Sequence, residues 1–262
     1  MLLAVSVGNS HITFGVHEAG AWIRRWRIQT VHAKTSDEYL VIFRTLLDAA
    51  RVTGSRITSA ILSSVVPPLT STMIEAMREL GRAPLLLSPA LDLGLRITTE
   101  NPAEVGADLV ANAAAAYERF HGNCIVVDFG TALSFTAVAA GGGSGAAGEL
   151  RGVAIAPGLT SAVNSLAHDT AQLPRIHLAP PPTAAGRTTV QSIQAGIVFG
   201  YAGLVEAIIR RMRAELGGAA DVVVTGGQSP IMAPVLGQPV VHEPWLTLEG
   251  LRIIAARNPR PG

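Results

Sequence analysis

The sequence predicts an α/β protein built from two related lobes with mixed sheets. Three observations support this: an internal repeat, apolar strands followed by amphipathic helices in both halves, and a composition that suits a large core. The chain has 262 residues, of which 48% are hydrophobic and 15% charged, so it can bury a substantial core. The repeat predicts an N-terminal lobe over residues 1–118 and a C-terminal lobe over residues 119–262.

The internal repeat relates residues 2–16, LLAVSVGNSHITFGV, to residues 124–138, CIVVDFGTALSFTAV. Each segment reads as an apolar strand, a glycine followed by a small polar residue, and a second strand of alternating pattern. Two such hairpins at corresponding places predict two related lobes, and antiparallel hairpins among strand–helix units predict mixed sheets. An alignment without gaps pairs Gly8 with Gly130, Asn9 with Thr131 and Ser6 with Asp128.

The remaining elements follow from apolar spacing and from the positions of glycine and proline. Helical spacing predicts helices over residues 36–50, from after Pro68 to about Leu80, within 103–119, and over 159–167, 189–216 and 246–257. Short apolar runs predict strands over residues 59–66, 84–88, 152–156 and 221–225. Ser36 is the expected N-cap of the first helix, and the glycines at 196–203 predict a break in the long helix.

Charge and cysteine content exclude several classes of protein. The net charge is +1 without a long basic run, so no nucleic-acid partner is expected. Cys124 is the one cysteine and lies in an apolar run, which predicts a core residue and excludes an intrachain disulfide. The N-terminus lacks a basic n-region, and no apolar stretch of about 18–20 residues runs without Gly, Pro or polar interruption. We therefore expect a cytoplasmic protein without a membrane span.

Three glycine turns follow apolar strands and predict a phosphate-binding function. They are Gly8-Asn9-Ser10, Gly130-Thr131-Ala132 and Gly226-Gly227. Backbone N–H groups converge in such turns, and glycine has no Cβ to block an anion. His11, beside the first turn, either contacts phosphate or takes a surface strand position. No Walker A or G-x-G-x-x-G motif occurs. The pairing of the first two turns by the internal repeat predicts a nucleotide gripped between them across a shared cleft, with the third turn near the nucleoside. The alternative is three ordinary β-turns.

Two aspartates are candidates for the chemistry of phosphoryl transfer, which needs carboxylates to manage a cation and the acceptor hydroxyl. Asp128 ends an apolar strand just before a glycine turn, where it either faces a cation or donor or caps the turn. Asp108 lies in EVGADLVANA, where it either accepts a substrate proton or serves as an N-terminal helix acid.

Eight segments in order make the chain resemble the type III pantothenate kinases over nearly its whole length. The resemblance implies an actin-like (ASKHA) fold with two ribonuclease H-like lobes and a homodimer. It also implies ATP-dependent phosphorylation of pantothenate to 4'-phosphopantothenate in coenzyme A biosynthesis, with Mg²⁺ and a monovalent cation, K⁺ or NH₄⁺. The matching segments are VGNSHITFG, SSVVPP, NPAEVGAD, VVDFGTA, AIAPGL, TAQLP, VTGGQS and LTLEGL.

The resemblance also implies roles for individual residues. Residues 6–13, including Ser6, Gly8, Asn9, Ser10 and His11, would form the first phosphate loop. Gly130 and Thr131 would contact ATP, Gly226 and Gly227 would lie near the nucleoside, and Asp128 would hold the monovalent cation. The acceptor site would comprise Thr99, Gly106, Ala107, Asp108 as catalytic base, Leu109, and Thr189 of the partner subunit at the dimer interface.

Three departures from the family pattern fall at these positions. Ser6 stands where the family has the acid of D-x-G-N-T, Leu109 where it has the arginine of G-A-D-R, and Thr99 where an aromatic residue is common. A serine hydroxyl cannot supply a carboxylate charge to Mg²⁺, and leucine cannot replace an arginine donor. Three hypotheses therefore stay open: a pantothenate kinase, a kinase for another small hydroxyl-bearing acceptor, and a catalytically silent homologue that binds a ligand or a regulatory partner.

Overall fold

The computed structural model describes residues 1–142, 147–170 and 172–259, which form two compact units. The first unit comprises Met1–Ala115 with Leu246–Gly262, and the second comprises Ala116–Trp245. This grouping differs from the expected boundary between residues 118 and 119, because the last helix, α7 (Leu246–Arg257), packs against β1, β2 and β4 of the first unit.

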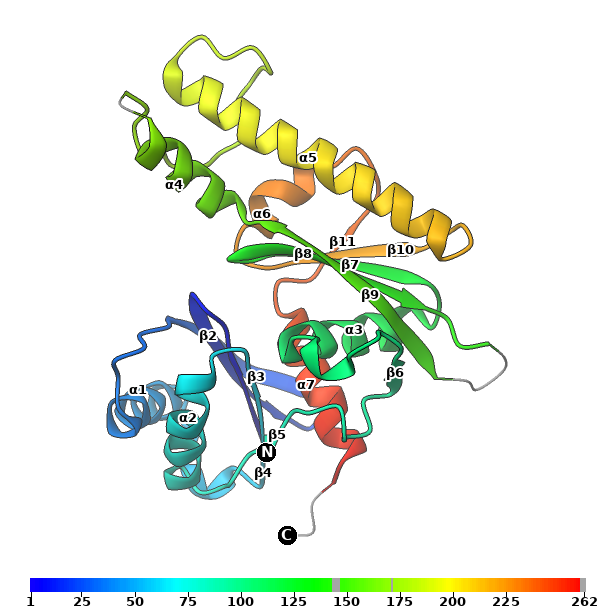
Figure 1. Cartoon of the computed structure of the whole chain (residues 1–262). Coiled ribbons are helices and arrows are strands. Elements are labelled where there is room, and N and C mark those ends of the chain that lie inside the picture. The colour runs from blue at the N-terminus through cyan, green and yellow to red at the C-terminus, as the bar shows by residue number, and fades with distance from the viewer. Residues whose placement is uncertain (143–146, 171, 260–262) are drawn as a thin grey trace. The chain divides into compact units, whose positions relative to one another are not determined.

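The first unit has a mixed five-stranded sheet in the order β3-β2-β1-β4-β5. β1 pairs antiparallel with β2 and parallel with β4. The helices α1 and α2 cover one face and enclose a core that includes Val5, Phe14 and Phe43 (Figure 1). The elements are β1 (Leu2–Val7), β2 (His11–Glu18), β3 (Ala21–Gln29), α1 (Ser36–Ala49), η1 (Gly54–Arg56), β4 (Ser59–Ser64), α2 (Pro67–Glu79), β5 (Leu85–Leu86), β6 (Leu95–Ile97) and η2 (Pro102–Glu104).

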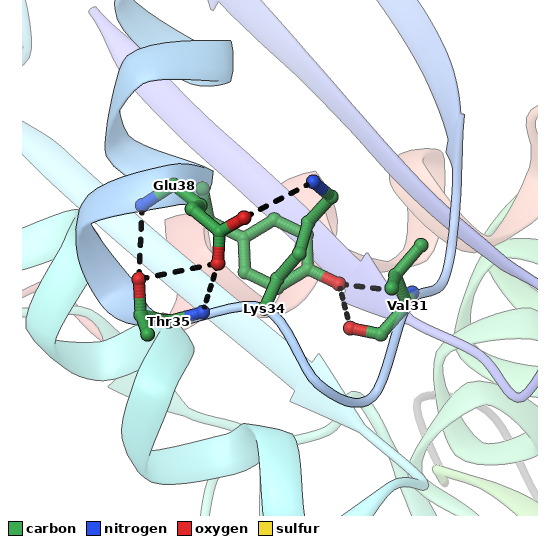
Figure 2. Close-up of polar contacts among 5 residues, drawn as sticks. Val31, Lys34, Thr35 and Glu38 are labelled. Atoms are coloured by element: carbon green, nitrogen blue, oxygen red, sulfur yellow. Dashed lines mark hydrogen bonds and ion pairs between the residues drawn. The ribbon is translucent and has the colours of Figure 1, made fainter.

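The start of α1 is fixed by a capping box rather than by the expected cap at Ser36. Thr35 Oγ1 accepts a hydrogen bond from the Glu38 N–H at 3.3 Å, and the Thr35 N–H donates to Glu38 Oε2 at 2.8 Å (Figure 2). Lys34 Nζ lies 3.5 Å from the other carboxylate oxygen of Glu38. The threonine takes the cap because its backbone is extended, whereas Ser36 is already the first helical residue.

The capping box predicts unequal effects for two neighbouring hydroxyls. Thr35→Ala removes the acceptor for an otherwise unpaired helix N–H, so the free energy of unfolding should fall by about 1 kcal/mol. Ser36→Ala should change it by no more than about 0.5 kcal/mol. Urea unfolding of the two variants measures the difference, and equal effects would contradict the assignment of the cap.

The opposite face of the first sheet is covered by the C-terminal helix. Trp22 Nε1 donates to Glu249 Oε2 at 3.0 Å, which ties β3 to α7. α7 also packs closely on α3 (Ala107–Phe120): a Cβ at Gly250 would lie 1.8 Å from the Ala111 carbonyl oxygen. Trp26, by contrast, stacks on Phe14 at 4.9 Å between ring centroids. Trp22 and Trp26 therefore pack against other elements of the first unit, on opposite faces of its sheet.

The second unit repeats the topology of the first. Its strands run β9-β8-β7-β10-β11, with β7 antiparallel to β8 and parallel to β10. α4, α5 and α6 lie on one side of this sheet (Figure 1). The elements are β7 (Cys124–Phe129), β8 (Ala132–Ala139), β9 (Gly148–Pro157), α4 (Leu159–Asp169), α5 (Thr189–Glu215), β10 (Asp221–Thr225), α6 (Ser229–Met232), η3 (Ala233–Val235) and β11 (Val241–His242).

The identical strand order and directions confirm two related lobes with mixed sheets. One detail of the alignment is wrong, however. Val7 pairs with Ile12 in the first hairpin, whereas Phe129 pairs with Leu133 in the second. The first turn is thus one residue longer, so the alignment without gaps holds up to the turn glycine and shifts by one afterwards.

The long helix α5 differs from the prediction in one way. It runs without a break from Thr189 to Glu215, because the helix interior tolerates isolated glycines at a modest cost. By length and composition this helix is apolar enough to cross a membrane, although Gly196, Gly200, Gly203 and Glu206 interrupt its apolar run. Val198, Val205 and Ile209 on this helix are fully buried against the sheet of the second unit.

Cys124 lies at the start of β7 and is fully buried. Burial raises the pKa of its thiol to about 12, with a smaller contribution from the charge of Asp221. We expect the native protein to react with a thiol reagent at pH 8 only as fast as it unfolds, because the thiolate is the reactive form. Rapid labelling of native protein, compared with protein in denaturant, would contradict this prediction.

Candidate functional site

The first glycine turn is held by Thr30, the residue that follows β3. The Gly8 N–H donates to the His11 carbonyl at 3.0 Å. Thr30 Oγ1 donates to the Gly8 carbonyl at 2.7 Å, and the Thr30 N–H donates to the Ser10 carbonyl at 3.0 Å. Two carbonyls of the turn thus have partners inside the protein, which fixes the turn's conformation.

His11 is exposed at the edge of this turn. Desolvation lowers the pKa of its imidazole, and the positive charge of Arg27 lowers it further. His11 is therefore mainly neutral at neutral pH. It remains a candidate phosphate contact, although its exposure also agrees with a surface strand position.

The segment Gly106–Leu109 enters α3 and places Asp108 in the helix's first turn. Asp108 Oδ1 accepts a hydrogen bond from the Leu109 N–H at 2.8 Å. A Cβ at Gly106 would lie 2.7 Å from the same Oδ1, so any larger residue at position 106 would displace the carboxylate. Burial is the main influence on this carboxyl and raises its pKa; the hydrogen bond from Leu109 acts in the opposite sense.

Val65 connects the segment Gly106–Leu109 with the first glycine turn. Its N–H donates to the Val7 carbonyl at 3.0 Å, directly before Gly8. Its Cγ1 lies 3.6 Å from the position that a Cβ would take on Gly106. The first unit therefore brings the Gly8 turn and the segment Gly106–Leu109 to the same end of β1 and β4. Thr99, after β6, has a buried Oγ1 without a hydrogen-bond partner.

In the second unit, two glycine turns gather around the end of β7. Asp128 pairs with Thr225 across the parallel strands β7 and β10. Gly226 has a φ of +93°, and a Cβ there would lie 2.4 Å from Asp128 Oδ1. A Cβ at Gly130 would lie 3.3 Å from the same oxygen. The structure thus brings Asp128, Gly130 and Gly226 together, and their roles stay predictions.

Gly158 packs closely on the second glycine turn, a contact that the sequence did not predict. It caps α4, and a Cβ there would lie 2.3 Å from the Thr131 carbonyl oxygen and 2.6 Å from that of Gly130. Ser161 Oγ in the same helix lies 3.4 Å from the Thr131 carbonyl. In the sequence, the Pro157–Gly158 pair after the predicted strand indicates a turn. It does not indicate which residues that turn contacts.

A second missed feature is the pair Ser229 and His242. Ser229 is fully buried, and its hydroxyl donates to the Gly226 carbonyl at 2.7 Å. The same Oγ lies 2.9 Å from His242 Nε2 in β11. Because the hydroxyl proton is used on Gly226, the imidazole is the donor in the second hydrogen bond. This chain of bonds holds Gly226 in its left-handed conformation.

Several predicted features stay predictions. Thr189 is the first residue of α5, after the N-cap Thr188, and its contact with an acceptor in a dimer is untested. So is the shared cleft between the two turns. Within residues 1–142, 147–170 and 172–259, no three His, Cys, Asp or Glu side chains cluster as metal ligands. The segment TAQLP includes residue 171, which lies outside the described residues.

Comparison with solved structures defines the class of protein. A Sinorhizobium meliloti protein described as a 2-dehydro-3-deoxygalactonokinase shares this fold with a TM-score of 0.60. The match covers 100% of this chain and 98% of that chain at 13% sequence identity. Together with the duplicated strand order, this likeness confirms the predicted α/β fold of the actin-like class, with two related lobes.

Comparison of sequences defines the family within that class. The sequence profile of the type III pantothenate kinases matches residues 2–211. A type III pantothenate kinase from Anaeromyxobacter sp. (strain K) is 43% identical over 259 residues, covering 98% of this chain and 100% of that protein. One from Moorella thermoacetica has the same identity and coverage. The chain belongs to the type III pantothenate kinase family.

Proposed function

We propose that this protein transfers the γ-phosphate of ATP to the hydroxyl group of pantothenate, forming 4'-phosphopantothenate for coenzyme A biosynthesis. Family membership over most of the chain supports the reaction class. The observation that carries the assignment is Asp108, an acid with a raised pKa at the start of α3. Through Val65 it is linked to the first glycine turn in the same unit.

Asp108 is the proposed general base. Its carboxylate accepts the proton of the acceptor hydroxyl while that oxygen forms a bond to the γ-phosphorus. The bond between this phosphorus and the β–γ bridging oxygen breaks, and ADP leaves with the electron pair. A raised pKa brings the base closer to neutral pH, which suits proton transfer. In the same unit, backbone amides at the turn of Gly8 supply donors to the phosphate oxygens.

The second unit offers a fitting place for the monovalent cation. At the end of β7, Asp128 Oδ1 lies 2.4 Å from the position that a Cβ would take on Gly226, so only glycine leaves space beside this carboxylate. A carboxylate oxygen supplies the negative charge that suits a cation such as K⁺ or NH₄⁺. When bound there, such a cation supplies positive charge next to the nucleotide. Asp128, Gly130 and Gly226 would hold it, and Thr131 would contact ATP.

We further propose a cytoplasmic homodimer in which Thr189 of the partner subunit contacts the acceptor. Gly106, Ala107, Leu109 and Thr99 would complete that site. Leu109 offers an apolar side chain instead of a cation, so recognition of the pantothenate carboxylate falls to other donors. Thr189→Ala should lose activity. Mixed dimers of the Thr189→Ala and Asp108→Asn chains should partly regain it, because one of their two sites would have both native residues. Unchanged KM for pantothenate in Thr189→Ala would argue against the shared site.

The deciding experiment is ADP release with ATP, Mg²⁺, K⁺ or NH₄⁺, and pantothenate, followed by identification of the product by mass spectrometry. Turnover that depends on pantothenate supports the proposal. Turnover only with another hydroxyl-bearing acid would indicate a different acceptor.

Ser6, which occupies the position of Asp128 in the repeat, favours one alternative: a silent homologue that binds without turnover. Activity absent in the native protein but present in the double variant Ser6→Asp with Leu109→Arg would establish that alternative.

A further inference from the structure

A row of hydroxyl groups crosses the first sheet at the base of the first glycine turn. Ser6 in β1 pairs with Ser63 in β4 and with Thr13 in β2. Thr13 in turn pairs with Arg27 in β3. Paired residues in neighbouring strands point to the same face of a sheet. This face lies opposite the α1–α2 core, because Val5, Leu62 and Phe14 take the alternate positions.

Ser63 carries an unsatisfied hydroxyl within this row. Only 1% of its surface is exposed, and its Oγ has no hydrogen-bond partner. A buried hydroxyl without a partner destabilises the fold, because it has lost its hydrogen bonds to water and gained none in the protein. An alanine would avoid that cost at the same size, so the hydroxyl has no structural reason to be there. Ser6 beside it is only 6% exposed.

The charge of the row suits an anion and does not suit a divalent cation. Its four members are three hydroxyl residues and an arginine, with no carboxylate. The arginine, Arg27, is paired with Thr13 across β2 and β3, and its charge adds to desolvation in lowering the pKa of His11. The corresponding row of the second unit, Thr225–Asp128–Ser134, does contain an acid. Mg²⁺ is held by carboxylates and substrate phosphates, so the residues of the first row do not fit a side-chain site for it.

We propose that Ser63, Ser6 and Thr13 form an oxyanion site that binds a phosphate group of the nucleotide directly through hydroxyl donors, without a carboxylate-held divalent cation. This inference rests on the proposed function for the identity of the phosphate donor. Any Mg²⁺ that accompanies ATP is then coordinated by the phosphates and not by this row. Ser63 is the deepest donor, and its partner is the ligand.

The test is calorimetric titration of the full-length protein with tripolyphosphate in EDTA, alongside thermal unfolding. Ser63→Ala should bind tripolyphosphate about tenfold or more weakly, because a hydrogen bond to a charged group is lost. Its Tm without ligand should be equal to or above that of the native protein. Ser59→Ala is the matched control: Ser59 lies on the same face of β4 but at its exposed far end, and neither value should change.

A second variant separates the direct site from a metal site. Ser6→Asp places a carboxylate in the row, so tripolyphosphate binding in EDTA should fall at least tenfold and recover when Mg²⁺ is added. Native protein that binds tripolyphosphate only with Mg²⁺ would overturn the inference. So would unchanged affinity, or a lowered Tm, in Ser63→Ala. If pantothenate is phosphorylated normally in these cases, the proposed function stands and only the direct site fails.

Discussion

Asp108→Asn is expected to lower kcat for pantothenate phosphorylation by about 10²–10⁴-fold, the range for loss of a general base. The amide has nearly the same shape, so the KM values for ATP and pantothenate should change little. Burial raises the pKa of Asp108 above its ordinary value of 3.8. The acid limb of the native kcat profile should therefore have its midpoint above that value and should be absent from the residual activity of the variant.

The same substitution should not destabilise the protein. The folded state holds the Asp108 proton more tightly than the unfolded state, since the folded pKa is raised. Stability contributed by this group is therefore present below the unfolded pKa and is lost as pH rises through the folded pKa. Above both values, Asn avoids the cost of the buried charge. Thermal unfolding at pH 7 should show a Tm equal to or higher than that of the native protein.

Asp37→Asn provides the matched control, because Asp37 is an exposed acid in the first turn of another helix, α1. It should leave kcat unchanged. An Asp108→Asn variant that keeps full kcat would show that Asp108 is only an N-terminal helix acid. A variant with low kcat and a much lower Tm would mean that the carboxylate is needed for folding.

The sequence predicted the fold well where a signal was local or repeated. The hairpin repeat indicated two related lobes, and β10 and α7 have the expected bounds. It could not place α7, because only tertiary contacts, such as that of Gly250 with Ala111, show which sheet it covers. It also assigned the α1 cap to Ser36 instead of Thr35, since both hydroxyls precede the apolar run.

The candidate site was predictable as a set of motifs but not as an arrangement. Gly8, Asp108 and Asp128 stood out because glycine turns and acids at strand or helix ends are visible in one dimension. The roles of Gly158 and Ser229 depend on contacts with Thr131 and Gly226, which lie 27 and 3 residues away along the chain. The orphan hydroxyl of Ser63 was invisible for the same reason: its significance comes from burial and pairing.

Gly226→Ala is expected to have the second large effect, on both stability and nucleotide use. The residue's φ is +93°, so alanine would be strained, and its Cβ would lie 2.4 Å from Asp128 Oδ1 and 2.5 Å from the Phe129 carbonyl carbon. The backbone strain costs about 1 kcal/mol, and displacing packed atoms costs about 1–3 kcal/mol more. The atoms that must move are the Asp128 carboxylate and the Phe129 backbone, which directly precedes Gly130. Because this shift would misplace the second glycine turn, kcat/KM for ATP should fall about 10²-fold.

A control substitution at Gly217 separates the effect of backbone strain from the effect of displacing packed atoms. Its φ of +85° is similar, but a Cβ there would meet nothing within 4 Å. Gly217→Ala should therefore lower the free energy of unfolding by only about 1 kcal/mol and leave kcat/KM for ATP unchanged. Urea unfolding and steady-state kinetics of the two variants measure the difference. If both variants lost ATP use equally, the turn at Gly226 would matter only for folding; if neither did, this turn would not be part of the nucleotide site.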